Sequence, residues 1–170
     1  MIAKPSGDGV PAYYQKYFDL VLEDDLGFAL DSGRSQMLAL LNEVPDSKLS
    51  FSYAPGKWSL AQVLLHIMDT ERVLNYRALA FARCETQSLP GFNEQVYAEN
   101  AGAEKRQKAD LLAEYEGIRA ASITFFKHCD PTALDRIGKA NEVAVTPKAI
   151  GWMIAGHELH HCKVIRERYL

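Results

Sequence analysis

The sequence predicts an all-α fold, a four-helix bundle formed by one domain that spans all 170 residues. Apolar residues recur at steps of three and four along four long segments, and helix start and stop signals bound these segments. Runs with the alternating pattern of strands are almost absent. Hydrophobic residues make up 48% of the chain, which is enough for a packed core and argues against disorder.

The N-terminal segment, residues 1–23, begins with Pro and Gly and continues with several aromatic residues. We expect it to form a strap that packs on the bundle, with room for one short helix. The first long helix should begin near Asp24 and end at Pro45, because proline stops a helix. Its apolar stripe consists of Leu26, Leu30, Gly33, Met37, Leu40 and Val44.

The second helix has the clearest start signal in the sequence. Ser59 and Gln62 have the spacing of a capping box, and Trp58 and Val63 stand where a hydrophobic staple would place them. The helix should run to about Arg83. Its apolar face consists of Leu60, Val63, Leu64, Ile67, Leu74, Ala78 and Phe81.

The segment that follows, residues 84–103, contains proline and glycine and is expected to be a long ordered loop, which in compact domains often has a function. The third helix should run from about Ala103 to His128, and the Asp-Pro step that follows should stop it. Residues 131–145 show no clear pattern and are expected to be irregular. The last helix should begin at Thr146, an N-cap followed by proline, and continue to the end of the chain.

Charge and composition exclude several functional classes. The net charge is −3, the isoelectric point is near 5.9, and the basic residues are interleaved with acidic ones, so we expect no nucleic-acid partner. No apolar run is long enough to cross a bilayer, and the first residues lack the apolar core of a signal peptide, so the expected location is cytoplasmic. The three cysteines are far apart and form no CxxC pair, which does not indicate a disulfide framework.

The last helix places two histidines where a bundle normally has leucine or isoleucine. His157 and His161 are four residues apart, which makes them neighbours on one helical face, and two imidazoles at this spacing can bind one metal ion. A catalytic metal usually takes three protein ligands. His66 lies at the edge of the apolar face of the second helix and is the natural third ligand. The pattern therefore predicts a site for one divalent transition metal at these three histidines.

Other interpretations of these residues remain open at this stage. Buried histidines can be satisfied by hydrogen bonds alone, although three on inward faces need many partners. Cys162 follows His161 directly and could be a ligand or simply a packed thiol. His160 points to the side of the metal-binding face, which indicates solvent or a supporting role. His128 ends a helix, where its charge suits the helix dipole.

The run from His157 to His161 also matches H-E-x-x-H, the zincin protease motif. The motif extends downstream to a glycine and a third histidine, but Val164 and Glu167 occupy those positions. We therefore do not interpret the chain as a protease. Glu158 lies within the motif and could still orient a metal-bound water.

Three segments in order resemble the DinB-like superfamily, also called DinB/YfiT-like. They are YAPGKWSLAQVLLHIMDTER (53–72), LPGFNEQVYA (89–98) and GWMIAGHELHHCKVIRERY (151–169). With the helices between them, the resemblance covers nearly the whole chain, and the combination is more specific than any one segment.

The resemblance implies a four-helix bundle with one histidine on the second helix and an H-x-x-x-H pair on the last, which here are His66, His157 and His161. It also implies a homodimer and bound zinc or nickel. Relatives include transferases that use low-molecular-weight thiols such as bacillithiol or mycothiol, a mycothiol-dependent isomerase, and proteins described as metal-dependent hydrolases.

Three functions follow as hypotheses. The first is a thiol-dependent S-transferase, in which the metal lowers the pKa of a low-molecular-weight thiol. The second is a metal-dependent hydrolase, in which the metal activates water. The third is a non-enzymatic metal-binding stress protein. A pocket beside the metal that accepts a small-molecule substrate would favour an enzyme.

Candidate residues for the chemistry accompany these hypotheses. Glu158 and Glu71 are the candidate catalytic acids or bases, although Glu71 could equally form a buried ion pair with an arginine such as Arg77, Arg83 or Arg119. The residues proposed to bind a cofactor or substrate are Phe92, Tyr97 and Arg77, with ordinary packing as the alternative for the two aromatic residues.

Overall fold

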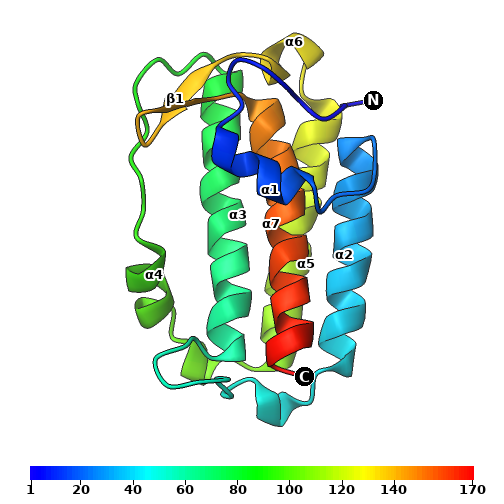
Figure 1. The fold of residues 1–170 in the computed structure, drawn as a ribbon, viewed down its shortest axis with the longest axis vertical. Coiled ribbons are helices and arrows are strands. Elements are labelled where there is room, and N and C mark those ends of the chain that lie inside the picture. Colours follow the sequence, from blue (N-terminus) through cyan, green and yellow to red (C-terminus); the bar gives the residue numbers. More distant parts are fainter.

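The computed structural model describes all residues, 1–170, and shows four long helices side by side, as the sequence predicted (Figure 1). The long helices are α2 (Leu26–Glu43), α3 (Leu60–Ala82), α5 (Lys108–His128) and α7 (Pro147–Arg168). The shorter elements are η1 (Ala12–Tyr14), α1 (Gln15–Phe18), η2 (Asp46–Lys48), α4 (Glu94–Asn100), η3 (Ala103–Lys105), α6 (Pro131–Leu134), β1 (Gly138–Ala140) and β2 (Val143–Val145). None of the helices combines the length and apolar character needed to span a bilayer.

The predicted helix starts rest on the expected side chains. The Ser59 hydroxyl accepts a hydrogen bond from the Gln62 backbone N–H, and the Gln62 side chain accepts one from the Ser59 N–H, which confirms the capping box of α3. Thr146 caps α7 by accepting from Ala149, with proline at the first helical position. Asp25 caps α2. These signals are local in sequence, so they fix where the helices that carry the histidines begin.

Two of the predicted connections are more structured than expected. The supposed loop 84–103 contains α4, which Asn93 caps by accepting from two backbone N–H groups. The third helix begins at Lys108 rather than Ala103, because Gly102 adopts a left-handed conformation (φ 63°) and residues 103–105 form only a 3-10 turn.

The region 131–145, predicted to be irregular, holds α6 and an antiparallel hairpin of β1 and β2. Its turn is Asn141-Glu142, and both residues have positive φ (50° and 61°), as the tightest hairpin turns require. The usual signal for such a turn is Asn-Gly, so glutamate at the second position hides it from sequence analysis. The hairpin lies over the end of α3, where a Cβ on Gly138 would be 2.1 Å from the Phe81 ring.

A polar layer divides the core into two apolar clusters. One cluster includes Leu30, Leu74, Phe126 and Trp152, and the other includes Met37, Leu64, Tyr115 and Ile165. Between them each long helix contributes small or polar residues. These residues are Gly33 on α2, Thr70 and Glu71 on α3, Arg119 and Ser122 on α5, and His157 and Glu158 on α7. The layer therefore contains both candidate carboxylates and one of the candidate metal ligands.

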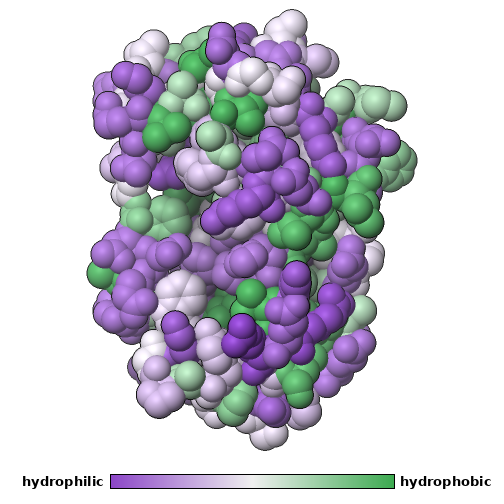
Figure 2. Space-filling view, in the orientation of Figure 1, coloured by the Kyte–Doolittle hydropathy of each residue, from purple (hydrophilic) through white to green (hydrophobic).

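The N-terminal segment runs across the bundle and packs on α7 through α1 (Figure 1). The contact is so close that a Cβ on Gly156 would be 2.3 Å from the Tyr17 carbonyl oxygen. The outer surface is largely hydrophilic on the face seen in Figure 2, with hydrophobic residues in small scattered groups. The strap thus covers α7 immediately beside His157.

Candidate metal centre

His66, His157 and His161 converge between α3 and α7, and we call them the histidine centre. One ring nitrogen from each lies within 4.8 Å of the others. His66 and His157 are only 6% and 7% exposed, and His161 is half-buried. The structure therefore brings together the three residues that the sequence singled out as ligands.

The spacing of the ring nitrogens fits one small cation. The Nε2 atom of His157 lies 3.2 Å from Nε2 of His66 and 3.1 Å from Nε2 of His161. Ligands of a tetrahedral zinc ion at about 2.0–2.1 Å are roughly 3.3 Å apart, by simple trigonometry from the bond length. Two of the three donor separations are thus close to those that such an ion imposes, and the third is at most 4.8 Å.

Hydrogen bonding between the rings explains the arrangement less well. In each neutral imidazole one nitrogen carries a hydrogen and the other a single lone pair. Nε2 of His157 faces both neighbours, so it would have to give one hydrogen, or one lone pair, to two partners at once. A shared cation would use all three Nε2 lone pairs, which supports a metal site.

Burial keeps the histidines neutral. It lowers the pKa of His66 to about 4 and the pKa of His161 to about 3, with smaller contributions from neighbouring histidines. The pKa of His157 is lowered as well, again chiefly by burial. At neutral pH the rings are therefore uncharged, which is the form that binds transition metals.

Aromatic groups enclose the centre. The Trp58 ring is 4.8 Å from the His66 ring, and the Tyr17 ring of the strap is 5.9 Å from the His157 ring. Tyr17 also meets His160 edge-on, at 5.7 Å. These groups hold the imidazoles in place and limit access of water from the α1 side.

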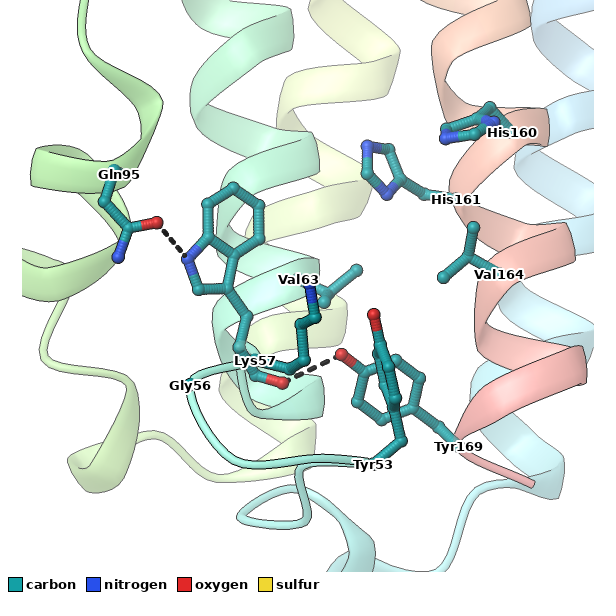
Figure 3. A pocket seen from close by; sticks show the side chains of 10 residues that line it. Tyr53, Gly56, Lys57, Val63, Gln95, His160, His161, Val164 and Tyr169 are labelled. Atoms are coloured by element: carbon teal, nitrogen blue, oxygen red, sulfur yellow. Dashed lines mark hydrogen bonds between the residues drawn. The ribbon is translucent and has the colours of Figure 1, made fainter.

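A pocket of about 350 Å³ opens beside His161 (Figure 3). It lies between α3, α7, the turn before α3, and α4. The lining residues are Tyr53, Gly56, Lys57, Trp58, Val63, Gln95, His160, His161, Val164 and Tyr169. Its volume falls at the small end of the range for small-molecule sites. The histidine centre therefore has an open side with room for a ligand.

The two candidate carboxylates form a separate cluster, which we call the arginine network. Arg119 donates to both oxygens of Glu71 (3.0 and 2.8 Å) and to the Leu30 carbonyl oxygen (3.2 Å), and it forms an ion pair with Glu158. Ser122 donates to Glu71, and Tyr115 donates to Glu158. All five side chains are at most 3% exposed.

This network decides between the alternatives for Glu71, because the buried ion pair with Arg119 is formed. Glu158 is adjacent to His157 in sequence but is directed toward Arg119 and Tyr115. Its expected role of orienting a metal-bound water has no support in these contacts. The reason is helical geometry, since consecutive residues point about 100° apart.

The residues proposed to bind a cofactor lie away from the pocket beside His161. Arg77 and Phe92 line a second cavity of about 180 Å³ with Asn141 of the hairpin turn, and Arg77 donates to the Pro90 carbonyl oxygen (2.7 Å). Tyr97 packs against Phe92 at 5.1 Å. Neither Phe92 nor Tyr97 lines the pocket beside His161, to which α4 presents Gln95 instead.

Sequence patterns do not reveal the residues that form the pocket. They assign Trp58 only to a helix start, whereas its indole N–H also donates to Gln95 (3.1 Å) and ties α4 to the pocket. Lys57 and Tyr169 have no distinctive pattern at all. A usable signal is the position of Lys57 and Trp58, which immediately precede the helix that carries His66.

Comparisons with known proteins agree with this fold. The family model described as "DinB superfamily" matches residues 29–165. A protein of Oceanobacillus iheyensis named "Putative metal-dependent hydrolase OB0413" is 24% identical over 129 residues, which covers 74% of this chain and 73% of that protein. YfiT from Bacillus subtilis, described as "a probable metal-dependent hydrolase with an unusual four-helix bundle topology", superposes with a TM-score of 0.71 at 15% identity, over 97% of this chain and 91% of that one.

Proposed function

The chain belongs to the DinB superfamily, and from this premise we propose that it is a metal-dependent enzyme that acts on a small molecule. His66, His157 and His161 hold one divalent transition-metal ion, zinc or nickel, through their Nε2 atoms. The observation that carries the proposal is the convergence of three neutral imidazole nitrogens beside a pocket that His161 lines.

The donor set suits catalysis. Three neutral ligands leave the charge of the ion undiminished and leave a position for a further ligand. When bound, such an ion lowers the pKa of a thiol or a water molecule so that it becomes a nucleophile at neutral pH. The aromatic side chains around the histidines restrict water, and the pocket holds the small molecule beside His161.

We propose that the nucleophile is the thiolate of a low-molecular-weight thiol, so that the reaction is an S-transfer. Hydrolysis by activated water usually also needs a general base, such as a histidine or a carboxylate. None of the pocket residues is acidic, and Glu71 and Glu158 are engaged by Arg119. Cys162, the cysteine nearest to the histidines in sequence, supplies no thiolate, because burial raises its pKa to about 12.

Metal-dependent hydrolysis is the second candidate, and the names of the two relatives favour it. In that case His160, which lines the pocket next to His161, is the titratable group placed to accept a proton. The pocket itself supports an enzyme over a metal-binding module without activity. We further propose that the chain forms a homodimer, as the family resemblance implies, and that it is located in the cytoplasm. Light scattering of the purified chain tests the dimer.

The experiment gives metal-loaded protein a chlorobimane together with bacillithiol, mycothiol or glutathione. Sulfur displaces chloride, the C–S bond forms as the C–Cl bond breaks, and the thiol proton passes to solvent. We expect at least one thiol to react faster than in the absence of protein, and the acceleration to vanish in His157→Ala. If no thiol is accelerated but an ester or amide is hydrolysed with the same histidine dependence, the hydrolase replaces the transferase. If neither activity appears in broad panels, the metal-binding module is favoured.

A further inference from the structure

The pocket beside the histidine centre combines one cation with aromatic walls. Figure 3 shows the Lys57 side chain rising from the turn before α3, near Tyr53 and Tyr169, and Trp58 also lines the pocket. Its amino nitrogen is directed into the space that these side chains and His161 enclose. We propose that this pocket binds small carboxylates with a flat apolar body, and that Lys57 holds the carboxylate. The inference rests on the proposed function, whose substrate or thiol partner it assigns to this chemical class.

Charge complementarity is the first support. Lys57 forms no ion pair within the protein. No aspartate or glutamate lines the pocket, although acidic residues outnumber basic ones in the chain by 22 to 19. Lys57 is exposed, and no carboxylate lining the pocket competes for its ammonium group, so the group is free to attract an anion.

The number of donors selects the kind of anion. A dianionic phosphate group is normally held by several donors, often a bidentate arginine or a row of backbone N–H groups. The pocket offers one ammonium group and no arginine. A carboxylate carries a single negative charge, so it matches one ammonium group better than a phosphate does.

The side chains that line the pocket favour a ligand whose remaining part is flat and apolar. Trp58, Tyr53 and Tyr169 present ring surfaces, and Val63 and Val164 add aliphatic surface nearer the histidines. Aromatic rings favour flat apolar partners through stacked and edge-on contacts. The volume of about 350 Å³ limits the ligand to a small molecule.

The pocket is also held in shape before any ligand arrives. The Tyr169 hydroxyl donates to the Trp58 carbonyl oxygen (2.8 Å), and the Tyr169 ring packs edge-on against Tyr53 at 5.2 Å. Gly56 adopts a left-handed conformation (φ 73°), which turns the chain just before Lys57. A preorganised site loses less entropy on binding, which favours a specific ligand over a chance surface contact.

The test compares two probes of nearly the same shape, 3-phenylpropionate and its neutral amide. Their affinities are measured by calorimetry with the full-length protein, both metal-loaded and treated with chelator. The chelated form is needed because a carboxylate can also bind a metal ion. In the chelated protein the histidine centre is neutral, so Lys57 is the one fixed positive charge in the pocket.

We expect the carboxylate to bind more tightly than the amide in both forms, by roughly twofold to fivefold for an exposed charge pair. Added salt should reduce this preference. Lys57→Gln should abolish the preference while the amide binds as before, which also shows that the pocket is intact. Lys139→Gln, which removes the same charge from the hairpin at the other end of the bundle, should change nothing (Figure 1).

Three results would overturn the inference. The first is equal binding of the two probes, or binding of neither. The second is a carboxylate preference that survives in Lys57→Gln. The third is a preference confined to the metal-loaded protein and insensitive to Lys57, which would place the carboxylate on the metal ion. Each of these leaves the proposed enzyme standing, because metal binding and thiol reactivity are measured separately.

Discussion

The histidine centre and the arginine network are two buried polar clusters that share α3 and α7 but differ in how their polar groups are satisfied. In the network, the Arg119 guanidinium meets two carboxylates and a backbone carbonyl. In the histidine centre, three ring nitrogens face one another and lack enough hydrogens to pair. The network therefore pairs its buried carboxylates with a cation from the chain itself, whereas hydrogen bonds within the chain do not satisfy the histidine centre.

The contrast shows how to separate structural from functional polar residues in a bundle core. Buried charges must be paired, so an arginine between two carboxylates is what stability alone would require. Stability alone does not require three imidazoles with competing lone pairs. His157 of one cluster and Glu158 of the other are consecutive residues, and both are buried. Neither burial nor position in the sequence would therefore distinguish the two clusters.

The largest effect should come from breaking the arginine network. Arg119→Leu leaves Glu71 and Glu158 buried without their cation, which should lower the free energy of unfolding by about 3–5 kcal/mol. Urea denaturation measures it. The matched control is Arg34→Leu, which removes a surface pair with Glu116 (3.2 Å) and should cost less than about 1 kcal/mol. Similar costs for the two variants would mean that the network contributes no more than a surface ion pair.

A smaller effect should follow from pH in the metal-free protein. The pKa of His161 is about 3 in the folded chain, against about 6.5 in an unfolded chain. Below pH 6.5 the unfolded chain therefore binds a proton that the folded chain does not, and stability falls as the pH drops. Between pH 7 and pH 5 the wild type should lose about 2 kcal/mol more than His161→Leu. Denaturation curves that fall in parallel for both proteins would contradict this account of His161.

The smallest of these effects concerns the helix that carries residues of both clusters. Ser59→Ala removes the hydroxyl that accepts from the Gln62 N–H and should destabilise the protein by about 1 kcal/mol. Because the cap lies more than two helical turns from Glu71, we expect no change in the pH dependence that separates wild type from His161→Leu. An unchanged denaturation midpoint would show that this cap contributes nothing.

Local patterns predict most of the fold and the histidine centre. The capping box at Ser59 and the four-residue spacing of His157 and His161 depend only on neighbours in sequence, so both can be recognised from the order of residues alone. His66 can be added because an amphipathic helix shows which face turns inward.

Features that depend on distant partners could not be predicted in the same way. Three arginines were candidates to pair with Glu71, and only the packing of α3 against α5 selects Arg119, 48 residues away. The pocket depends on Gln95 and Trp58 meeting across 37 residues, and the staple pattern that marks Trp58 does not indicate so distant a partner. The hairpin was missed because glutamate rarely occupies a left-handed position.

The most direct test of the central claim is elemental analysis of protein without a histidine tag, after loading with zinc or nickel and removal of free metal. The wild type should carry about one ion per chain. His161→Leu should carry almost none while its circular dichroism remains that of a folded helical bundle, because leucine suits an inward position between α3 and α7. Substoichiometric metal in the wild type, or equal metal in both proteins, would contradict a three-histidine metal centre.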